Sequence, residues 1–228
     1  MRRGALCYLV SAMNLNIIID GLLQYICLVI LLTFHEFAHA WVASKCGDDT
    51  ARLQGRVSLN PIVHMDLIGT VILPLAALML AGAGSGLASF IIGWGRPVPV
   101  DMRNLRKPRR DDTLIALAVP AMNLVLAFAL MGVVKGFAVA HMDGMLKVTA
   151  LMIQISLILC FFNLLPIPPL DGSHVLKNLI GMADETYFRL CQFGFVIVIV
   201  AIQIPFVRHL LGACVSVSMV TFAKAFRV

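Results

Sequence analysis

Long apolar runs are the feature of this sequence that most restricts how the chain can fold. A helix needs about 20 apolar residues to cross the roughly 30 Å hydrocarbon layer of a bilayer. Runs near that length lie at about 15–43, 67–92, 113–140, 145–165, 187–204 and 207–223. Only 13% of the residues are charged, about half the share found in typical soluble domains. The sequence therefore predicts an all-α polytopic membrane protein with about five to six hydrophobic segments.

Between these runs, no segment is suited to form a separate soluble domain. No repeat, low-complexity block or long linker divides the chain, so we expect one integral-membrane domain over 1–228. Its core would lie at about 15–176 and its C-terminal helices at about 187–223. The formal net charge is +6, but without a soluble domain to carry a basic face we expect no nucleic-acid partner. The anionic cytoplasmic lipid surface is the partner that this charge favours.

Two segments depart from the pattern of simple spanning helices. The run at 67–92 contains Pro74 and the sequence GAGSG at 82–86, which favours a break in the helix. We therefore predict a re-entrant hairpin for this run. Apolar and polar residues alternate at about 51–60, and this period predicts a short β element at the membrane boundary.

The sequence HEFAH places two histidines and a glutamate inside the first apolar run. On a helix, His35 and His39 lie one turn apart on the same face, so both imidazoles can bind one metal ion. Glu36 lies beside that face, where it can take a proton from a metal-bound water. The alternative is a buried cluster of hydrogen bonds, but ionisable residues inside a membrane usually serve a function.

A catalytic zinc usually has three protein ligands, and Asp171 is the best candidate for the third. Most other acidic residues lie in evident loops, whereas Asp171 ends the segment FFNLLPIPPLDG, which contains three prolines. Because proline does not extend a helix, we expect extended backbone that is buried in protein or lines a cavity. Gly172 would allow a tight turn directly after the acid. The alternative is an ordinary helix-terminating turn capped by Asp171.

Together these motifs resemble a known family. HEFAH followed by FNLLPIPPLDG is similar to the site-2 protease family of intramembrane zinc metalloproteases. The segments GRVSLNPIVHMDLIGT and GWGRPVPV resemble its compact prokaryotic branch, which has no PDZ or CBS domains. The resemblance covers about residues 35–176.

The resemblance implies a set of roles for the residues in these motifs. It implies one Zn²⁺ bound by His35, His39 and Asp171, with Glu36 as the catalytic base. In the family, an asparagine that precedes the acidic ligand steadies the substrate carbonyl or oxyanion, and Asn163 matches that position. An amide N–H₂ suits this role; the alternative for Asn163 is a helix-to-loop hydrogen bond.

Other positions depart from the family pattern or keep several interpretations. The family usually has Gly-Pro-x-x-Asn early in the following core helix, and here Val119 replaces the glycine while Asn123 remains; we expect looser packing there and no loss of chemistry. His64 and Asp66 could form a second metal pair, orient the ligands, or cap the loop before the next run. His174 could replace a ligand, move protons or lie at the membrane interface.

The metal site also restricts the topology. If all six runs crossed the membrane, the first and fourth would be antiparallel, and the two histidines would lie at the opposite membrane face from Asp171. A re-entrant run at 67–92 makes these helices parallel. The resulting topology places most Lys and Arg on one side, as an all-spanning topology also would. The positive-inside rule then places the active site nearer the cytoplasmic face.

The sequence thus predicts an intramembrane zinc endopeptidase that cleaves peptide bonds in or near transmembrane segments of membrane proteins, as in regulated intramembrane proteolysis. Its partners would be a transmembrane substrate, which the strands at 51–60 would bind by β-augmentation, and the lipid bilayer of a prokaryotic cell (inner) membrane. The alternative is a non-proteolytic membrane metal-binding protein or transporter. A transporter should have further acids or histidines along a pathway, and few occur here.

Overall fold

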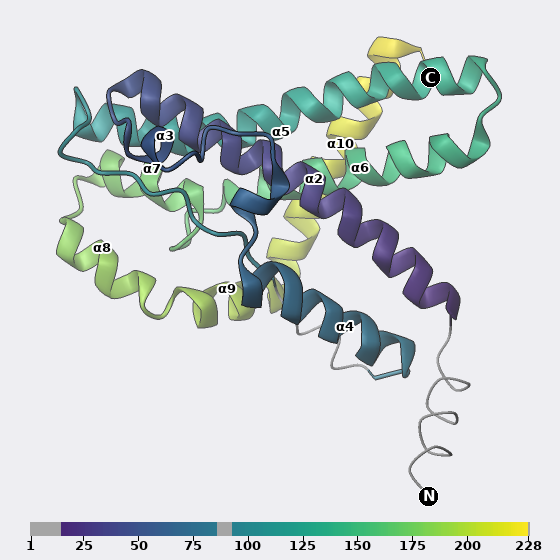
Figure 1. Ribbon diagram of the computed structural model, residues 1–228, viewed down its shortest axis with the longest axis horizontal. Helices are drawn as coiled ribbons and strands as arrows, with labels where there is room; N and C mark the ends of the chain where they lie inside the picture. The colour runs from purple at the N-terminus through teal and green to yellow at the C-terminus, as the bar shows by residue number, and fades with distance from the viewer. Residues whose placement is uncertain (1–14, 86–92, 228) are drawn as a thin grey trace, which may run out of the picture. The chain divides into compact units, whose positions relative to one another are not determined.

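The computed structural model describes residues 15–85 and 93–227, and all regular secondary structure in these residues is helical (Figure 1). The all-α prediction is therefore confirmed. In chain order, the elements are α2 (Leu15–Cys46), α3 (Thr50–Leu53), the 3₁₀-helix η1 (Pro61–His64), the π-helix η2 (Leu67–Ile72), α4 (Leu73–Gly82), α5 (Pro108–Val139), α6 (Asp143–Asn163), α7 (Asp171–Ile180), α8 (Asp184–Cys191), α9 (Gly194–Gln203) and α10 (Pro205–Phe226).

Four of these helices are long and apolar enough to cross a membrane: α2, α5, α6 and α10. Helices α8 and α9 would together make a fifth span, bent by 64°. The described residues thus contain four to five candidate spans, where the sequence predicted about five to six hydrophobic segments. Apolar side chains of these helices point outward, and Val125 and Val217 are more than 60% exposed, as expected for side chains that contact lipid tails.

The predicted β element at 51–60 is wrong. Residues 50–53 form the short helix α3, and turns and bends follow it. The Asp48 side chain accepts hydrogen bonds from the backbone N–H and hydroxyl of Thr50, a local contact that favours a turn over a strand at this point. Ala51 is buried whereas Leu53 is 86% exposed, so the two do not share one face as strand residues would. Because no strand forms at these residues, the predicted pairing of such strands with a substrate is wrong as well.

The run at 67–92 is only partly described. Asp66 caps its N-terminus by accepting the backbone N–H groups of Ile68 and Gly69. Helix continues through η2 and α4 and ends at Gly82, so it is shorter than the candidate spans. The chain then turns at Gly84, where φ is +74°, a conformation that favours glycine. Residues 86–92 lie outside the described residues, so the re-entrant hairpin stays a prediction.

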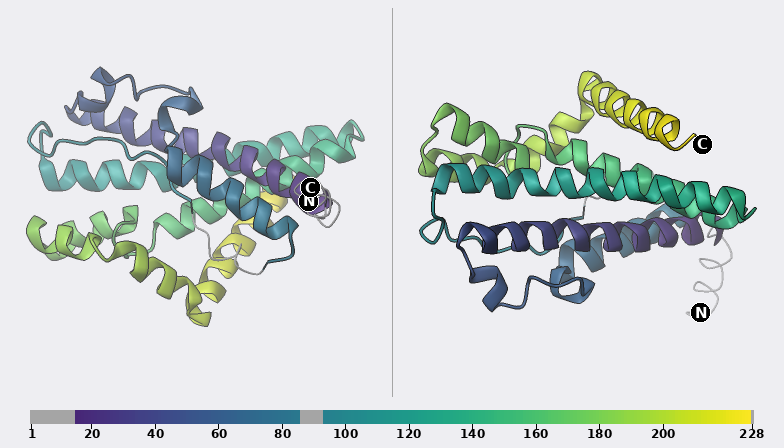
Figure 2. Two further views of the ribbon diagram at one scale, coloured as in Figure 1. Left: turned by 60° about the horizontal axis from the view of Figure 1, so that its bottom comes forward. Right: turned by 90° about the horizontal axis from the view of Figure 1, so that it is seen from above.

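The chain divides into two compact units. One contains Met1–Thr33 and Asn60–Pro97, and the other contains Phe34–Leu59 and Val98–Val228, so α2 contributes to both. In the second unit, α5 and α6 form a long antiparallel hairpin against which α10 and α7 pack (Figures 1 and 2). The core of that hairpin is formed by Ala127, Met131, Ile153, Leu157 and Val215.

The second unit also anchors the loop that precedes α5. Asp48 is fully buried just after α2, and its carboxylate accepts the Asp101 backbone N–H at 2.7 Å and the Asn104 amide at 3.1 Å. Burial raises the pKa of Asp48, but these donors and those of Thr50 outweigh burial and hold it below its ordinary value. The anchored loop leads into α5, whose residues contact the candidate site described below.

Candidate metal centre

The three residues of the HEFAH motif lie on the C-terminal half of α2. His35 and Glu36 are buried and His39 is half-buried. The rings of His35 and His39 are 5.5 Å apart between centroids and meet edge to face at 80°. The one-turn spacing therefore brings both imidazoles to one place, as the sequence predicted.

Asp171, the first residue of α7, meets both histidines. Its Oδ1 lies 3.1 Å from Nε2 of His39, and its Oδ2 lies 3.9 Å from Nε2 of His35. Candidate ligand atoms of the three residues all fall within 4.8 Å of one another. The structure thus brings together side chains from positions 35, 39 and 171, and each histidine presents its Nε2 to the carboxylate.

A metal ion fits this arrangement. Within the described part of the chain, Asp171 Oδ2 is buried and has no hydrogen-bond partner, which is costly unless a cation or donor satisfies it. Burial raises the pKa of Asp171, but His39 and His35 outweigh burial and hold it below its ordinary value. The two histidines thus favour the ionised carboxylate, which is the form that binds metals. Two imidazoles and one carboxylate are a donor set typical of catalytic zinc.

The turn before α7 explains the unusual sequence around Asp171. Helix α6 ends at Asn163, and residues 164–170 form turns that contain the three prolines. These turns are more compact than the predicted extended segment, because Ile167 and Leu170 donate backbone hydrogen bonds within them. Gly172 is required for close packing: a Cβ there would lie 2.2 Å from the Leu164 carbonyl oxygen. Its conformation is helical, so the turn predicted at this glycine is wrong.

Helix α7 is held against α5 by one buried carboxylate. Asp112 Oδ1 lies 3.0 Å from Nδ1 of His174, and Asp112 Oδ2 accepts the Asn178 amide at 2.8 Å. The two partners lie one turn apart on α7, so a single acid orients the helix that begins with Asp171. His174 is therefore part of a helix contact and lies outside the candidate ligand group.

Sequence reasoning missed Asp112, which it placed among the loop acids. The available signal was the acid at the start of an apolar run, combined with His174 and Asn178 at helical spacing after the candidate ligand. Helix α8 adds a second support, since Ser173 Oγ lies 2.9 Å from the Tyr187 hydroxyl and Lys177 pairs with Asp184 at 2.6 Å.

Two further contacts join the histidines to α5. His39 Nδ1 lies 3.2 Å from the Ile115 carbonyl oxygen, and the Asn123 amide nitrogen lies 3.4 Å from Nδ1 of His35. Asn123 is fully buried. Both imidazoles thus have Nε2 directed at Asp171 and Nδ1 directed at α5, a contact that the sequence prediction for Asn123 did not include.

The other residues that the sequence singled out, Glu36, Asn163, His64 and Asp66, lie outside the group of three candidate ligands. Glu36 accepts the backbone N–H of Val98. The side-chain nitrogen of Asn163 donates to the Leu159 carbonyl at 2.8 Å, a bond within its own helix. Asp66 caps η2, as one of its interpretations predicted, and His64 is buried nearby in the same unit. Neither His64 nor Asp66 belongs to the candidate ligand group.

Comparisons with known proteins agree with the site. Residues 24–142 and 131–202 match the model of peptidase family M50. The chain is 34% identical over 209 residues to "Putative zinc metalloprotease YwhC" of Bacillus subtilis (strain 168), which covers 88% of this chain and 89% of that protein. It is 31% identical over 204 residues to "Putative zinc metalloprotease Rip2" of Mycolicibacterium smegmatis, covering 83% and 67%.

No solved structure matches the chain. The family match spans most of the sequence, and it includes the positions of both histidines, Glu36 and Asp171. The apolar helices of the structure agree with an integral membrane protein. The chain therefore belongs to peptidase family M50, the site-2 protease family, and is a zinc metalloprotease.

Proposed function

We propose that this protein is an intramembrane endopeptidase that cleaves peptide bonds in or near transmembrane segments of membrane-protein substrates, as in regulated intramembrane proteolysis. The observation that carries the proposal is the group formed by His35, His39 and Asp171. Two of these residues lie on α2, a helix long and apolar enough to span a bilayer. A site on such a helix favours substrates that are themselves in the membrane.

His35 and His39 would hold one Zn²⁺ through Nε2, and Asp171 would hold it through its carboxylate. When bound, zinc supplies a Lewis acid for the substrate carbonyl and lowers the pKa of a bound water. Glu36 follows His35 directly on α2 and is buried. In our proposal its carboxylate accepts the proton of the attacking water and returns it to the leaving amine.

Asn163 is proposed to steady the developing oxyanion. Its amide has two N–H groups, of which one is engaged with Leu159. The second N–H, or a rotation of the side chain, would provide the donor to the substrate oxygen. The substrate helix must unwind locally, since the peptide bonds of an intact helix are shielded and their carbonyls are already hydrogen-bonded.

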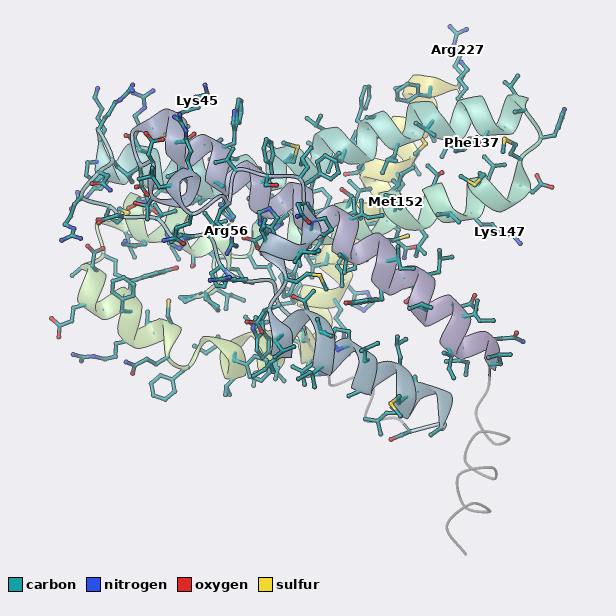
Figure 3. The ribbon with its side chains drawn as sticks, viewed as in Figure 1. Lys45, Arg56, Phe137, Lys147, Met152 and Arg227 are labelled. Carbon is teal, nitrogen blue, oxygen red and sulfur yellow. The ribbon has the colours of Figure 1, made fainter. Side chains whose placement is uncertain are left out.

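The second unit supports a membrane position for this chemistry. Lys147 lies toward the end of the α5–α6 hairpin, and Lys45, at the end of α2, lies toward the opposite end of the unit (Figure 3). Apolar helix separates these charged ends. From the Lys and Arg distribution of the sequence, we propose a prokaryotic inner membrane with the active site nearer the cytoplasmic face.

A test of the proposal uses purified protein in detergent or liposomes with a panel of single-span substrates. Wild type should contain zinc and cleave at least one substrate, whereas Glu36→Gln should retain zinc and lose about 10²–10⁴-fold in rate. Glu185→Gln, an exposed acid on α8, is the matched control and should behave as wild type. Equal cleavage by wild type and Glu36→Gln would refute the assigned base. Zinc-loaded wild type that cleaves nothing would favour the metal-binding or transport alternative.

A further inference from the structure

Asn123 of α5 has an unusual environment. Its side chain is fully buried, its amide nitrogen lies 3.4 Å from His35 Nδ1, and its Oδ1 is buried without a hydrogen-bond partner among the described residues. A buried amide oxygen without a donor is unfavourable. Next to a candidate metal ligand, it indicates a bond that this orientation of the amide does not make.

The neighbouring histidine shows which bond is expected. His39 Nδ1 lies 3.2 Å from the Ile115 carbonyl, and a carbonyl oxygen can only accept, so this Nδ1 must carry the proton. In the neutral imidazole that binds a metal, its Nε2, which faces Asp171 at 3.1 Å, then has the free lone pair that a metal requires. The backbone of α5 thus selects the tautomer of His39.

His35 has the same orientation, with Nε2 toward Asp171 and Nδ1 toward α5. If its Nε2 has the free lone pair, its Nδ1 carries the proton and needs an acceptor. In the present orientation, the N–H₂ of Asn123 would meet that N–H as a second donor. Rotation of the amide by about 180° exchanges nitrogen and oxygen within nearly the same volume. Oδ1 would then accept from His35.

We propose that Asn123 is a positioning residue: its Oδ1 accepts Nδ1–H of His35 and holds the ring in the tautomer that presents Nε2 to the metal site. The proposal rests on the ligand set of the proposed function. Outer partners of this kind fix the orientation and basicity of metal-binding histidines. Helix α5 would then orient His39 by a main-chain carbonyl and His35 by a side-chain amide.

The backbone at Asn123 is itself held in place. Ser156 of α6 is fully buried, and its hydroxyl donates to the backbone carbonyl oxygen of Asn123 at 2.7 Å. This contact ties the turn of α5 that carries Asn123 to α6 without touching the amide group. Ser156 therefore provides a control that changes the packing around Asn123 but leaves its side chain intact.

The test measures zinc affinity by competition with a chelator, using the full-length protein in detergent. Asn123→Leu, which has no acceptor, should bind zinc about 10- to 100-fold more weakly. Asn123→Asp, which keeps an acceptor at the same place, should bind within a few-fold of wild type or more tightly. Ser156→Ala should keep wild-type affinity even where its unfolding temperature falls. Zinc affinity unchanged in Asn123→Leu, or lost equally in Ser156→Ala, would overturn the proposal.

Nitrogen NMR of wild-type protein with labelled histidine gives a readout that requires no variant to fold. His35 should carry its proton on Nδ1 in the zinc-bound protein, and a proton on Nε2 would overturn the proposal. The variant His35→Ala distinguishes a failure of the proposed role of Asn123 from a failure of the proposed ligand set. If His35→Ala loses zinc but Asn123→Leu does not, only the role of Asn123 is wrong. If His35→Ala binds zinc as wild type does, the ligand set of the proposed function is wrong, and the role of Asn123 is wrong with it.

Discussion

Asp48 and Asp171 are both buried or nearly buried acids in the same unit, but their surroundings differ. Asp48 accepts hydrogen bonds from Thr50, Asp101 and Asn104, so both of its oxygens have donors. Asp171 faces two imidazole nitrogens, and its Oδ2 has no hydrogen-bond partner among the described residues. The carboxylate of Asp48, whose oxygens both accept hydrogen bonds, anchors a loop. The carboxylate of Asp171 lies beside two histidines with one oxygen lacking a hydrogen bond, which indicates a site that binds a cation.

Asp112 combines features of the two. Its oxygens are satisfied by His174 and Asn178, as those of Asp48 are by the loop, but its partners belong to the helix that begins with the candidate ligand. Loss of the Asp112 carboxylate should therefore weaken zinc binding as well as the packing of α7 on α5. The following predictions test this order, from the largest expected effect to the smallest.

Asp171→Asn should abolish zinc binding and proteolysis while leaving the metal-free fold nearly unchanged. Bound metal contributes several kcal/mol to the transition state, and each 1.36 kcal/mol is a factor of ten in rate, so activity should fall by about 10³-fold or more. Elemental analysis and cleavage of a single-span substrate measure the two losses. Stoichiometric zinc in the active, purified variant would contradict the assignment.

Asp112→Asn should weaken zinc binding and lower kcat by about 10-fold, since supports of metal ligands typically contribute 10- to 100-fold. Asp111→Asn is the matched control: Asp111 is also buried, but it accepts the Lys107 backbone N–H at 2.7 Å, a hydrogen bond local to the start of α5. We expect Asp111→Asn to reduce the unfolding temperature more than the zinc affinity. Equal losses of zinc affinity in both variants would show that Asp112 contributes only to the general stability of the fold.

Asp48→Asn should destabilise the fold by about 1–3 kcal/mol, because an amide would place a donor where several donors now converge. Zinc affinity per folded molecule should stay at the wild-type value. Denaturant unfolding of the metal-free protein measures the first quantity, and chelator competition measures the second. A large loss of zinc affinity would show that Asp48 is coupled to the site and remove the contrast with Asp171.

The pH dependence of stability should carry a small contribution from Asp48. Its pKa is held below the ordinary value near 3.8, so the ionised form stabilises the fold above that value. This contribution is lost as the pH falls through the lower, folded-state pKa. The free energy of unfolding of wild type should therefore fall more steeply than that of Asp48→Asn as the pH drops below about 4. Identical slopes would mean that Asp48 has the same pKa in the folded and unfolded states.

Local spacing explains which parts of the site were predictable. The placement of His35 and His39 follows from helical geometry alone, and three prolines in an apolar run singled out Asp171. The strand prediction at 51–60 was wrong because local spacing was not sufficient there. Alternation over a few residues does not distinguish a strand from a short helix and turn, and the side chain of Asp48, which precedes the segment, favours a turn over a strand.

The sequence by itself determined the class of this protein: apolar runs of membrane length, an i, i+4 histidine pair, and an acid after prolines. These features depend on neighbouring residues, so they can be recognised without a fold. Tertiary structure alone decided that Asp171 meets the histidines and that Asp112 holds α7. It also placed Ile115 and Asn123 against the Nδ1 atoms of the two ligands. These contacts join residues that are 62 to 136 positions apart in the chain, and only the packing of α2, α5 and α7 brings them together.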